Sequence, residues 1–310
     1  MQVRQAALSD AGAITEVYKS LVTQWKRADD PQSLRYEDLS LFDRWQYGGP
    51  WFSVETCAVW LGHLIQRGEG IPLVAELDGE VVGHAEVFIG NEAAPYQNHI
   101  NISILCVREG AHRKGVGSAL VRYVEQMAAV LNCKRVTVAY PEPPPFFEKL
   151  GYTQSVARHR LLIAAEEGRV FYKARDLVDD APQQIEEWYM PLGRFQNARE
   201  EWERMYWRIW SGVPELVEAR WHRLHIDLTG QPGILHLHQQ REDPELVTAR
   251  LWTKNPVSTH ILSAIRDRAA RLGYQRIATV IEAEARPLLQ DGEDQYDIQW
   301  LYSKTLGTDI

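Results

Sequence analysis

Hydrophobic residues recur along the first half of the chain at two spacings, the alternation of strands and the three-to-four-residue step of amphipathic helices. Residues 3–7 are strand-like, and the hydrophobic residues of segment 14–21 fall on one face of a helix. Residues 72–77 and 81–89 flank Asp78-Gly79, a pair typical of two-residue hairpin turns. The pattern therefore predicts a strand, a helix and an antiparallel hairpin, in this order.

The same two spacings continue beyond the hairpin. Residues 99–107 alternate as a strand, and a polar, glycine-bearing loop leads to a helical face between residues 118 and 131. Residues 134–140 are β-branched and strand-like, and residues 146–150 form a short helix after a proline-rich turn. This order of elements predicts an α/β fold with a mixed, mostly antiparallel central sheet and helices on both faces.

The second half of the chain repeats this pattern. We expect a strand at 171–177, a helix at 185–189, a hairpin of 224–228 and 234–238 around Thr229-Gly230-Gln231, a strand at 246–252, a helix at 261–272 and a strand after Gly273. The boundary falls near Glu166-Glu167-Gly168. The sequence therefore predicts two similar domains, residues 1–167 and 168–310.

Composition narrows the classes of function. A net charge of −8 argues against an extended nucleic-acid surface, and no run reaches the roughly 18–20 apolar residues of a membrane helix. Cys57, Cys106 and Cys133 lack the spacing of metal ligands and cannot all pair, which fits a reducing compartment. We expect a cytoplasmic protein with no nucleic-acid or membrane partner.

The loop between residues 107 and 120 carries the most informative chemistry. It joins a strand to a helix, and the free N–H groups of a helix N-terminus bind anions. Gly115 and Gly117 let the backbone approach a diphosphate, and Arg113 and Lys114 add positive charge. The segment therefore predicts a diphosphate-binding loop.

Two common phosphate-binding loops do not fit this segment. A P-loop needs a lysine after its last glycine, where this chain has Val116. A dinucleotide fingerprint needs a small residue where this chain has Leu120. A nucleotide-dependent kinase or ATPase is therefore disfavoured.

The loop instead resembles motif A of the GNAT acetyltransferase superfamily, in which Arg or Gln precedes two spaced small residues. The segment reads His112-Arg113-Lys114-Gly115-Val116-Gly117-Ser118, with His112 in the Arg/Gln position. Residues 145–152, which include Phe147-Glu148-Lys149-Leu150-Gly151, look like the family's Phe-Tyr-Glu-Lys-Leu-Gly-Phe segment. The resemblance covers about residues 1–160.

The resemblance implies a site for acetyl-CoA. Pantetheine would lie along Leu105, Cys106 and Val107, and the pyrophosphate would contact His112, Arg113, Lys114, Gly115, Val116, Gly117 and Ser118. Phe147 falls where the family's tyrosine protonates the departing thiolate, but it has no hydroxyl. Tyr140, Tyr152 or a water proton are the alternatives.

The resemblance also implies that the acceptor amine attacks the thioester directly, within a ternary complex. His84 and Glu86 share one strand face and are candidate bases; a structural pair, with water as the base, is the alternative. Cys106 lies in an apolar strand, which favours an inert thiol over a nucleophile.

An aromatic stretch at residues 27–70, with a helix expected at 54–66, occupies the place of the family's acceptor wall. A cage for a cationic amine could be formed there by Trp45, Tyr47, Trp51, Phe52 and Glu55. A small hydrophobic core that seals the sheet edge is the alternative interpretation.

In the second half, segment 253–259 stands where motif A would be, but it contains Pro256 and no glycine. We expect this half to have lost CoA binding and to shape the acceptor site. For His222, His225, His236 and His238 we favour ordinary packing, with no metal.

The sequence thus predicts a monomeric tandem-GNAT N-acetyltransferase that transfers acetyl from acetyl-CoA to a primary amine of a small molecule or peptide. The alternative is a CoA-binding regulatory or interaction protein with the same fold and little activity.

Overall fold

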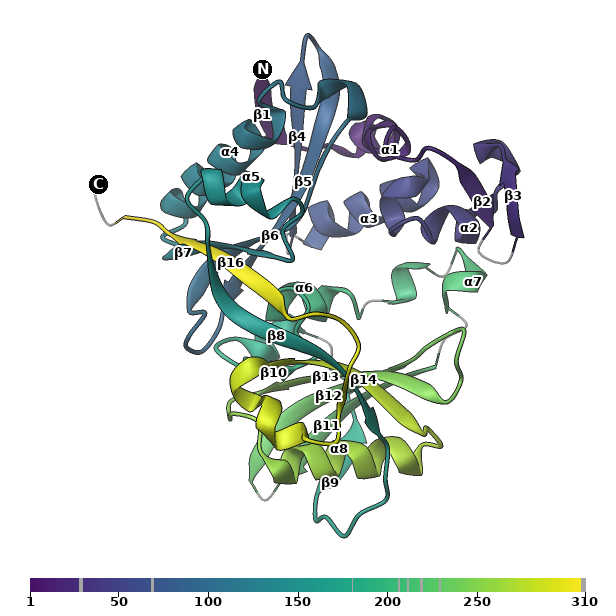
Figure 1. Ribbon diagram of the computed structural model, residues 1–310, viewed down its shortest axis with the longest axis vertical. Coiled ribbons are helices and arrows are strands. Elements are labelled where there is room, and N and C mark those ends of the chain that lie inside the picture. Colours follow the sequence, from purple (N-terminus) through teal and green to yellow (C-terminus); the bar gives the residue numbers. More distant parts are fainter. Residues whose placement is uncertain are drawn as a thin grey trace.

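Figure 1 shows two α/β halves joined by long central strands. The computed structural model describes residues 1–27, 30–67, 70–179, 181–205, 207–210, 212–217, 220–228 and 230–307. The first half contributes the strands β1 (Gln2–Gln5), β4 (Gly70–Leu77), β5 (Glu80–Asn91), β6 (Asn98–Val107), β7 (Arg135–Ala139) and β8 (Thr153–Ala164). A separate two-stranded sheet is formed by β2 (Trp25–Arg27) and β3 (Asp30–Leu34).

Helices cover both faces of the first half's sheet, as expected. They are α1 (Ala11–Lys19), α2 (Leu41–Trp45), α3 (Val54–Arg67), α4 (Val116–Val130) and α5 (Pro144–Lys149), with short 3-10 turns at Leu8–Asp10, Tyr36–Asp38, Pro50–Phe52 and Glu109–Ala111. In Figure 1, α4 and α5 lie on one side of the strands, and α1 and α3 lie on the other. On α4, the buried residues Leu120, Val124 and Ala128 follow the helical spacing seen in the sequence.

The second half has its own strands and helices. They are β9 (Lys173–Asp176), β10 (Tyr189–Leu192), β11 (Trp221–Leu228), β12 (Gln231–Gln239), β13 (Leu246–Thr253), β14 (Arg276–Glu282), β15 (Glu293–Asp294) and β16 (Gln299–Thr305), with α6 (Ala198–Glu203), α7 (Pro214–Val217) and α8 (Thr259–Arg271). The 3-10 turns are Pro182–Ile185, Trp207–Trp210 and Ala283–Leu289. The expected hairpin is confirmed, with β11 and β12 antiparallel; Thr229, in its turn, lies outside the described residues.

The expected helix at residues 185–189 is wrong. The chain forms a 3-10 turn at Pro182–Ile185 and then enters strand β10 at Tyr189. Met190 and Leu192 are fully buried within the sheet, where Leu192 pairs with Leu251 on β13. Tertiary strand pairing therefore overrides the short helical pattern.

The two halves share one sheet because they exchange strands. The order is β1-β4-β5-β6-β7-β16-β8-β14-β10-β13-β12-β11-β9, with β15 added on β8. The last strand, β16, lies between β7 and β8, where Leu301 pairs with both Ala139 and Val156. The distal part of β8 pairs instead with β14, from Arg158 to Ala164. A boundary at residue 167 stays a prediction, since each half includes a strand beside the other's.

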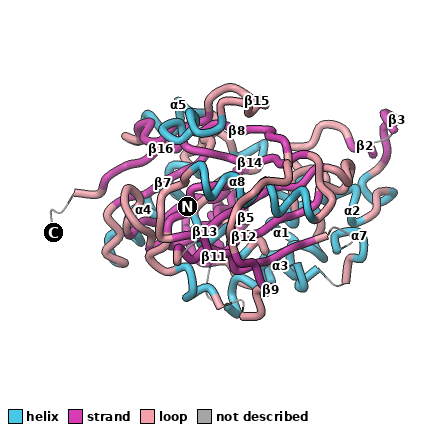
Figure 2. The backbone as a smooth tube through the Cα atoms, turned by 90° about the horizontal axis from the view of Figure 1, so that it is seen from below, coloured by secondary structure: helices cyan, strands magenta, loops and turns pink. Residues whose placement is uncertain are grey.

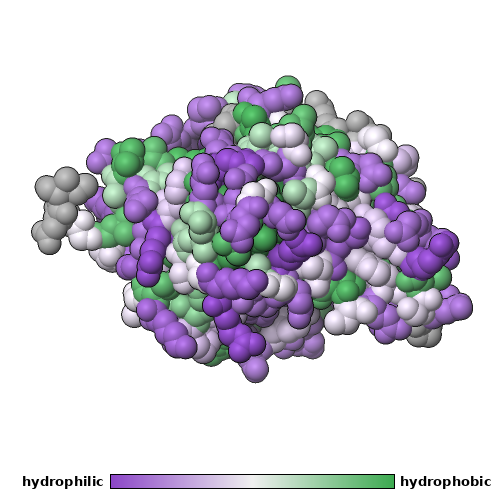
Figure 3. All heavy atoms as spheres, turned by 90° about the horizontal axis from the view of Figure 1, so that it is seen from above, coloured by the Kyte–Doolittle hydropathy of each residue, from purple (hydrophilic) through white to green (hydrophobic). Residues whose placement is uncertain are grey.

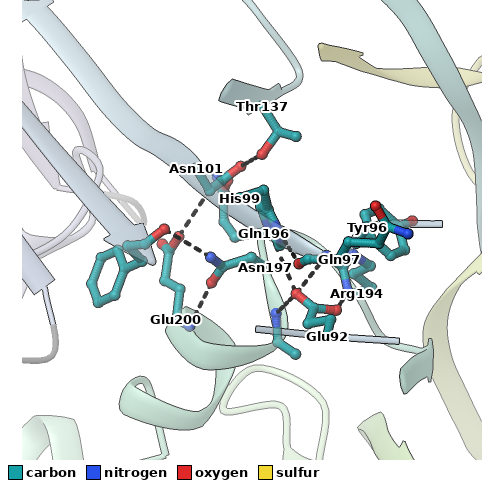
Figure 4. A network of polar contacts seen from close by, with 12 residues as sticks. Glu92, Tyr96, Gln97, His99, Asn101, Thr137, Arg194, Gln196, Asn197 and Glu200 are labelled. Atoms are coloured by element: carbon teal, nitrogen blue, oxygen red, sulfur yellow. Dashed lines mark hydrogen bonds and ion pairs between the residues drawn. The ribbon is translucent and has the colours of Figure 1, made fainter. Parts of the chain in front are cut away.

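A buried polar network fixes the two halves against each other (Figure 4). The carboxylate of Glu92, after β5, accepts two bonds from the Arg194 guanidinium, which also lies 3.5 Å from the ring centre of Tyr96. Asn197 donates to the Phe88 carbonyl at 3.0 Å, and Asn101 donates to Gln196 at 3.0 Å. These contacts seat the segment before α6, and α6 itself, on β5 and β6.

The outside of the molecule is mixed in polarity. Figure 3 shows polar side chains over most of one face, with hydrophobic ones in small separate groups. Figure 2 shows β2 and β3 at the end of the molecule opposite the C-terminal strand. None of the helices in the described part of the chain has both the length and the apolar character needed to cross a membrane.

The Arg194–Glu92 pair makes the first prediction. The two side chains are only 3% and 2% exposed, so Arg194→Met leaves a buried carboxylate without its counter-charge. We expect this variant to lose about 3–5 kcal/mol of unfolding free energy, measured by urea denaturation. In the control, Arg35→Met breaks a pair whose side chains are 78% and 43% exposed, and its unfolding free energy should stay close to that of the wild type. Equal losses in the two variants would contradict this role.

Candidate functional site

A gap opens in the first half's sheet where two parallel strands separate. β6 and β7 pair from His99 with Arg135 to Ile102 with Val138, and the pairing stops there. β6 continues to Val107, with a register shift against β5 between residues 86 and 87 that leaves Ser103 without a partner. The edge of residues 103–107 that points toward β7 therefore has no strand partner, and we call the parting of β6 and β7 beyond this point the slot.

The free edge of β6 presents backbone groups to this slot. The N–H of Arg108 donates to the Val82 carbonyl on β5 at 2.9 Å. Because bonding direction alternates along an antiparallel strand, Cys106 also bonds toward β5, whereas Leu105 and Val107 face the slot. An extended ligand can thus bond to β6 as an added strand would.

The loop at the end of the slot is shaped for an anion. Gly115 has φ 84° and caps α4, and exposed Arg113 has φ 61°. The first N–H groups of α4, from Val116 to Ser118, have no acceptor within the helix. A Cβ at Gly117 would lie 3.2 Å from Phe146 and 3.6 Å from Leu105, so a side chain at this position would crowd the space between the loop and β6.

The residues predicted to contact the cofactor lie along β6 and in the loop before α4, but the side chain of Cys106 and the ring of Phe147 point elsewhere. The Cys106 side chain packs away from the slot, against the α1 and α3 face, and burial raises the pKa of its thiol to about 12, which makes it inert. The Phe147 ring is 3% exposed and packs between Phe146 and Tyr152. It is Phe146, which the sequence did not single out, that faces Gly117.

The candidate bases lie together under an aromatic wall. Glu86 is 1% exposed, and its carboxylate accepts bonds from the indole N–H of Trp51 at 2.7 Å and of Trp60 at 3.0 Å. Burial raises the pKa of Glu86 to about 7, although the two indoles oppose the shift. Nε2 of His84 is 3.6 Å from this carboxylate, and Nδ1 is 2.9 Å from the Tyr18 hydroxyl.

His84 differs from Glu86 in its charge state. Burial lowers the pKa of His84 to about 3, so the imidazole is neutral at physiological pH. A neutral ring can orient the nearby groups, whereas Glu86 changes its charge near pH 7. Of the two, Glu86 has the pKa suited to a general base.

A cavity of about 510 Å³ lies on the other side of the aromatic wall, between the halves. Its tryptophans are Trp45, Trp51 and Trp60 from the first half, with Trp210 and Trp221 from the second. Glu203, Glu215 and Glu242 add carboxylates. The Glu203 side chain is fully buried and is 2.9 Å from His63. Aromatic faces and carboxylates together suit a cationic amine.

The predicted acceptor residues separate into two groups. Trp45 and Trp51 line this cavity, whereas Tyr47 and Glu55 lie outside its lining. The Tyr47 hydroxyl accepts a bond from the Lys26 N–H at 2.6 Å, and its ring lies 4.5 Å from that of Trp25. Tyr47, with Phe52, therefore joins the small aromatic core that was the alternative interpretation.

The slot also contacts residues that the sequence did not single out. Ser103 donates to the carboxylate of Glu200 on α6, which Arg204 binds at 2.7 Å. The spacing of Glu200 and Arg204 predicts only a helical ion pair. Nothing in it places α6 against a strand roughly one hundred residues earlier in the chain.

Tyr140 stands on the opposite wall of the slot, just after β7. Its ring centre lies 4.5 Å from that of Phe195, and its hydroxyl is buried with no hydrogen-bond partner among the described residues. The structure therefore separates Tyr140 from the pair formed by His84 and Glu86.

In the second half, the parallel strands β13 and β14 also separate, but another strand occupies the gap between them. β13 and β14 pair from Leu246 with Arg276 to Thr248 with Ala278. Beyond this point β10 lies between them, with Leu192 paired to both. A Cβ at Gly193 would be 2.3 Å from the Ala249 carbonyl, so the fit there is close.

The histidines of the second hairpin pack against an aromatic ring. Trp221 stacks on His236 and His238, with ring centres 5.0 and 3.9 Å apart. Within the described ranges, no three His, Cys, Asp or Glu side chains are grouped as metal ligands. Burial lowers the pKa of both imidazoles.

Comparison with known proteins agrees with this geometry. Residues 23–152 match the Acetyltransferase (GNAT) family. No curated protein matches the sequence. A tandem GNAT protein from the clavulanic acid biosynthesis pathway has a similar structure, with TM-score 0.54, 14% identity and coverage of 100% of this chain and 99% of that chain.

Two further structures share the fold over the whole chain. A GCN5-related N-acetyltransferase from Anabaena variabilis has TM-score 0.62 and 11% identity, covering 99% of this chain and 73% of that one. A putative acetyltransferase from Pyrococcus horikoshii has TM-score 0.54 and 14% identity, covering 99% and 89%. At these identities the likeness concerns the fold. Residues 23–152 therefore match the GNAT acetyltransferase family, and the chain as a whole has the fold of a tandem GNAT protein.

Proposed function

We propose that this protein is an N-acetyltransferase that transfers the acetyl group of acetyl-CoA to a primary amine. The observation that carries the proposal is the parting of β6 and β7, where one edge of β6 has no strand partner and the loop before α4 stands at its end. A strand edge beside a helix N-terminus fits a long ligand that carries a diphosphate at one end.

Each part of acetyl-CoA has candidate binding groups in this chain. The N-terminal amides of α4, with Arg113 and Lys114, would hold the diphosphate. The N–H and C=O groups of Leu105 and the N–H of Val107 would bind the pantetheine amides. The Val107 carbonyl already accepts a hydrogen bond from Nε2 of His112 at 2.8 Å. A β6 N–H aimed into the slot would stabilise the negative charge that develops on the thioester oxygen.

The transfer requires a proton to leave the amine. The amine nitrogen attacks the thioester carbon, the C–S bond breaks, and CoA leaves as a thiolate that takes up a proton. We propose Glu86 as the base, acting through a water because Trp51 and Trp60 cover its carboxylate. Tyr140, on the opposite wall of the slot, is the proposed proton donor to the thiolate.

A specific observation favours the second candidate function, a CoA-binding regulatory or interaction protein. The family's usual tyrosine hydroxyl is missing at Phe147, which is buried among aromatic rings. Binding of acetyl-CoA without formation of an acetylated product would support this alternative.

We also propose that the acceptor is a small molecule or peptide, and that the protein acts as a cytoplasmic monomer. The insertion of β16 between β7 and β8 supports the monomer, because the chain itself supplies the strand that closes the first half's sheet.

Calorimetric titration of acetyl-CoA tests the proposed cofactor site. We expect close to one equivalent per chain, because β10 fills the corresponding gap in the second half. Gly117→Trp should weaken binding at least about tenfold, since a side chain there meets Phe146 and Leu105. The matched control is Gly110→Trp in the same loop, where a Cβ meets open space and binding should persist. Binding of two equivalents, or undiminished binding to Gly117→Trp, would contradict the assignment.

Glu86→Gln tests the proposed base. We expect the acetylation rate to fall by about 10²–10⁴-fold while acetyl-CoA still binds. The Glu86 carboxylate is protonated below pH about 7 and accepts a proton only above it, so the wild-type rate should rise through this pH. The variant should lack this rise. Glu55→Gln, on the exposed start of α3, is the control and should keep both the rate and the rise.

The same variant has a readout that is independent of turnover. Because folding raises the pKa of Glu86 from 4.5 to about 7, the unfolded chain loses this proton first as pH increases. The wild type should therefore lose unfolding free energy between pH 4.5 and 7 relative to Glu86→Gln. A constant difference between the two proteins over this range would show that Glu86 is not buried as described.

A further inference from the structure

A second cavity, of about 580 Å³, lies beside the tryptophan-lined one. Arg204 and Gln240 belong to the lining of both cavities, so the two meet at these residues. The second cavity is lined by residues of β8, β13 and β14, on one face of the second half's sheet. The two cavities therefore adjoin at Arg204 and Gln240, and we call them together the cleft; their linings differ chemically.

The second end is rich in arginine. Arg160, Arg204, Arg250 and Arg276 line it, together with the single acidic residue Glu201. Three of the arginines have carboxylate partners: Arg204 binds Glu200 at 2.7 Å, Arg250 binds Glu201 at 2.8 Å, and Arg276 binds Asp243. These carboxylates neutralise the three arginines, and Arg160 is the fourth.

Arg160 differs from its neighbours. Its guanidinium lies over the ring of Phe195 at 4.8 Å and over that of Tyr296 at 5.1 Å. Within the described residues it makes no ion pair, and its side chain donates no hydrogen bond. Two aromatic faces hold the cation in place but leave the N–H groups in its plane free. This fork matches the oxygens of a carboxylate or phosphate.

The arginine end adjoins the place where acetyl transfer would occur. Phe195, which contacts Arg160, also contacts Tyr140 on one wall of the slot. Arg204, at the junction of the two cavities, binds Glu200, which accepts a hydrogen bond from Ser103 on the other wall. A ligand in the cleft would thus pass the slot between its tryptophan-lined end and its arginine-lined end.

We propose that the acceptor is an amine that also carries a carboxylate or a phosphate, and that Arg160 binds this anionic group. The inference rests on the proposed acetyltransferase function and adds the class of acceptor. The anion fixes one end of the molecule beside Phe195, and the carboxylates and indoles of the neighbouring cavity attract its ammonium group along the cleft toward the slot.

Matched pairs of amines test this proposal by calorimetry on the CoA-loaded full chain, where no turnover occurs. The pairs are γ-aminobutyrate with butylamine, and phosphoethanolamine with ethanolamine; they separate a carboxylate from a phosphate as the preferred anion. The variant is Arg160→Gln. The matched control is Arg223→Gln, a half-buried arginine on β11 outside both cavity linings.

In the wild type, we expect at least one anionic amine to bind about tenfold or more tightly than its uncharged partner. Arg160→Gln should remove this preference and leave acetyl-CoA binding intact, and Arg223→Gln should keep it. Equal affinities within both pairs, no binding of either anionic amine, or a preference that survives in Arg160→Gln would overturn the proposal. Failure of the acetyltransferase function appears separately, as absence of acetyl-CoA binding or of acetylated product.

Discussion

The point at which the parallel pairing of β6 and β7 stops is the constraint on which the functional part of the structure depends. Beyond Ile102 and Val138 the strands separate, and the bulge at Ser103 turns the free edge of β6 toward the gap. A sheet interior ordinarily has no unpaired backbone groups, because burying them is costly. Here one edge of β6 has no strand partner, although the Ser103 carbonyl accepts a bond from Gln196 and the Val107 carbonyl accepts one from His112. The loop before α4 places the first amides of that helix at one end of this edge.

In the second half, the equivalent gap between parallel strands is closed. There, β10 enters the equivalent gap and pairs with both β13 and β14. The filled gap satisfies the backbone and stabilises a hydrophobic core, but it removes the space for a ligand. The second half instead contributes α6 and the segment before it, which reach the first half's strands through Asn197, Glu200 and the buried Arg194–Glu92 pair. One half therefore keeps the slot, and the other forms one side of the cleft beside it.

Strand exchange makes this arrangement rigid. The last strand of the chain, β16, supports β7, which is one wall of the slot, and β8 extends from one half into the other. Relative movement of the halves would break backbone hydrogen bonds along these strands as well as the buried ion pair. The tryptophan-lined and arginine-lined cavities therefore keep a fixed position relative to the slot.

The sequence by itself determined most of the local elements and the position of the glycine-bearing loop before α4. Alternation and helical spacing located the hairpins and α4, and Gly115 and Gly117 with their neighbours indicated the loop, because these signals depend on residues close together in the chain. Only the tertiary structure decided the fate of residues 185–189, the placement of β16, and the contact of Ser103 with Glu200. Each of these depends on pairing between segments far apart in sequence, where burial outweighs local propensity.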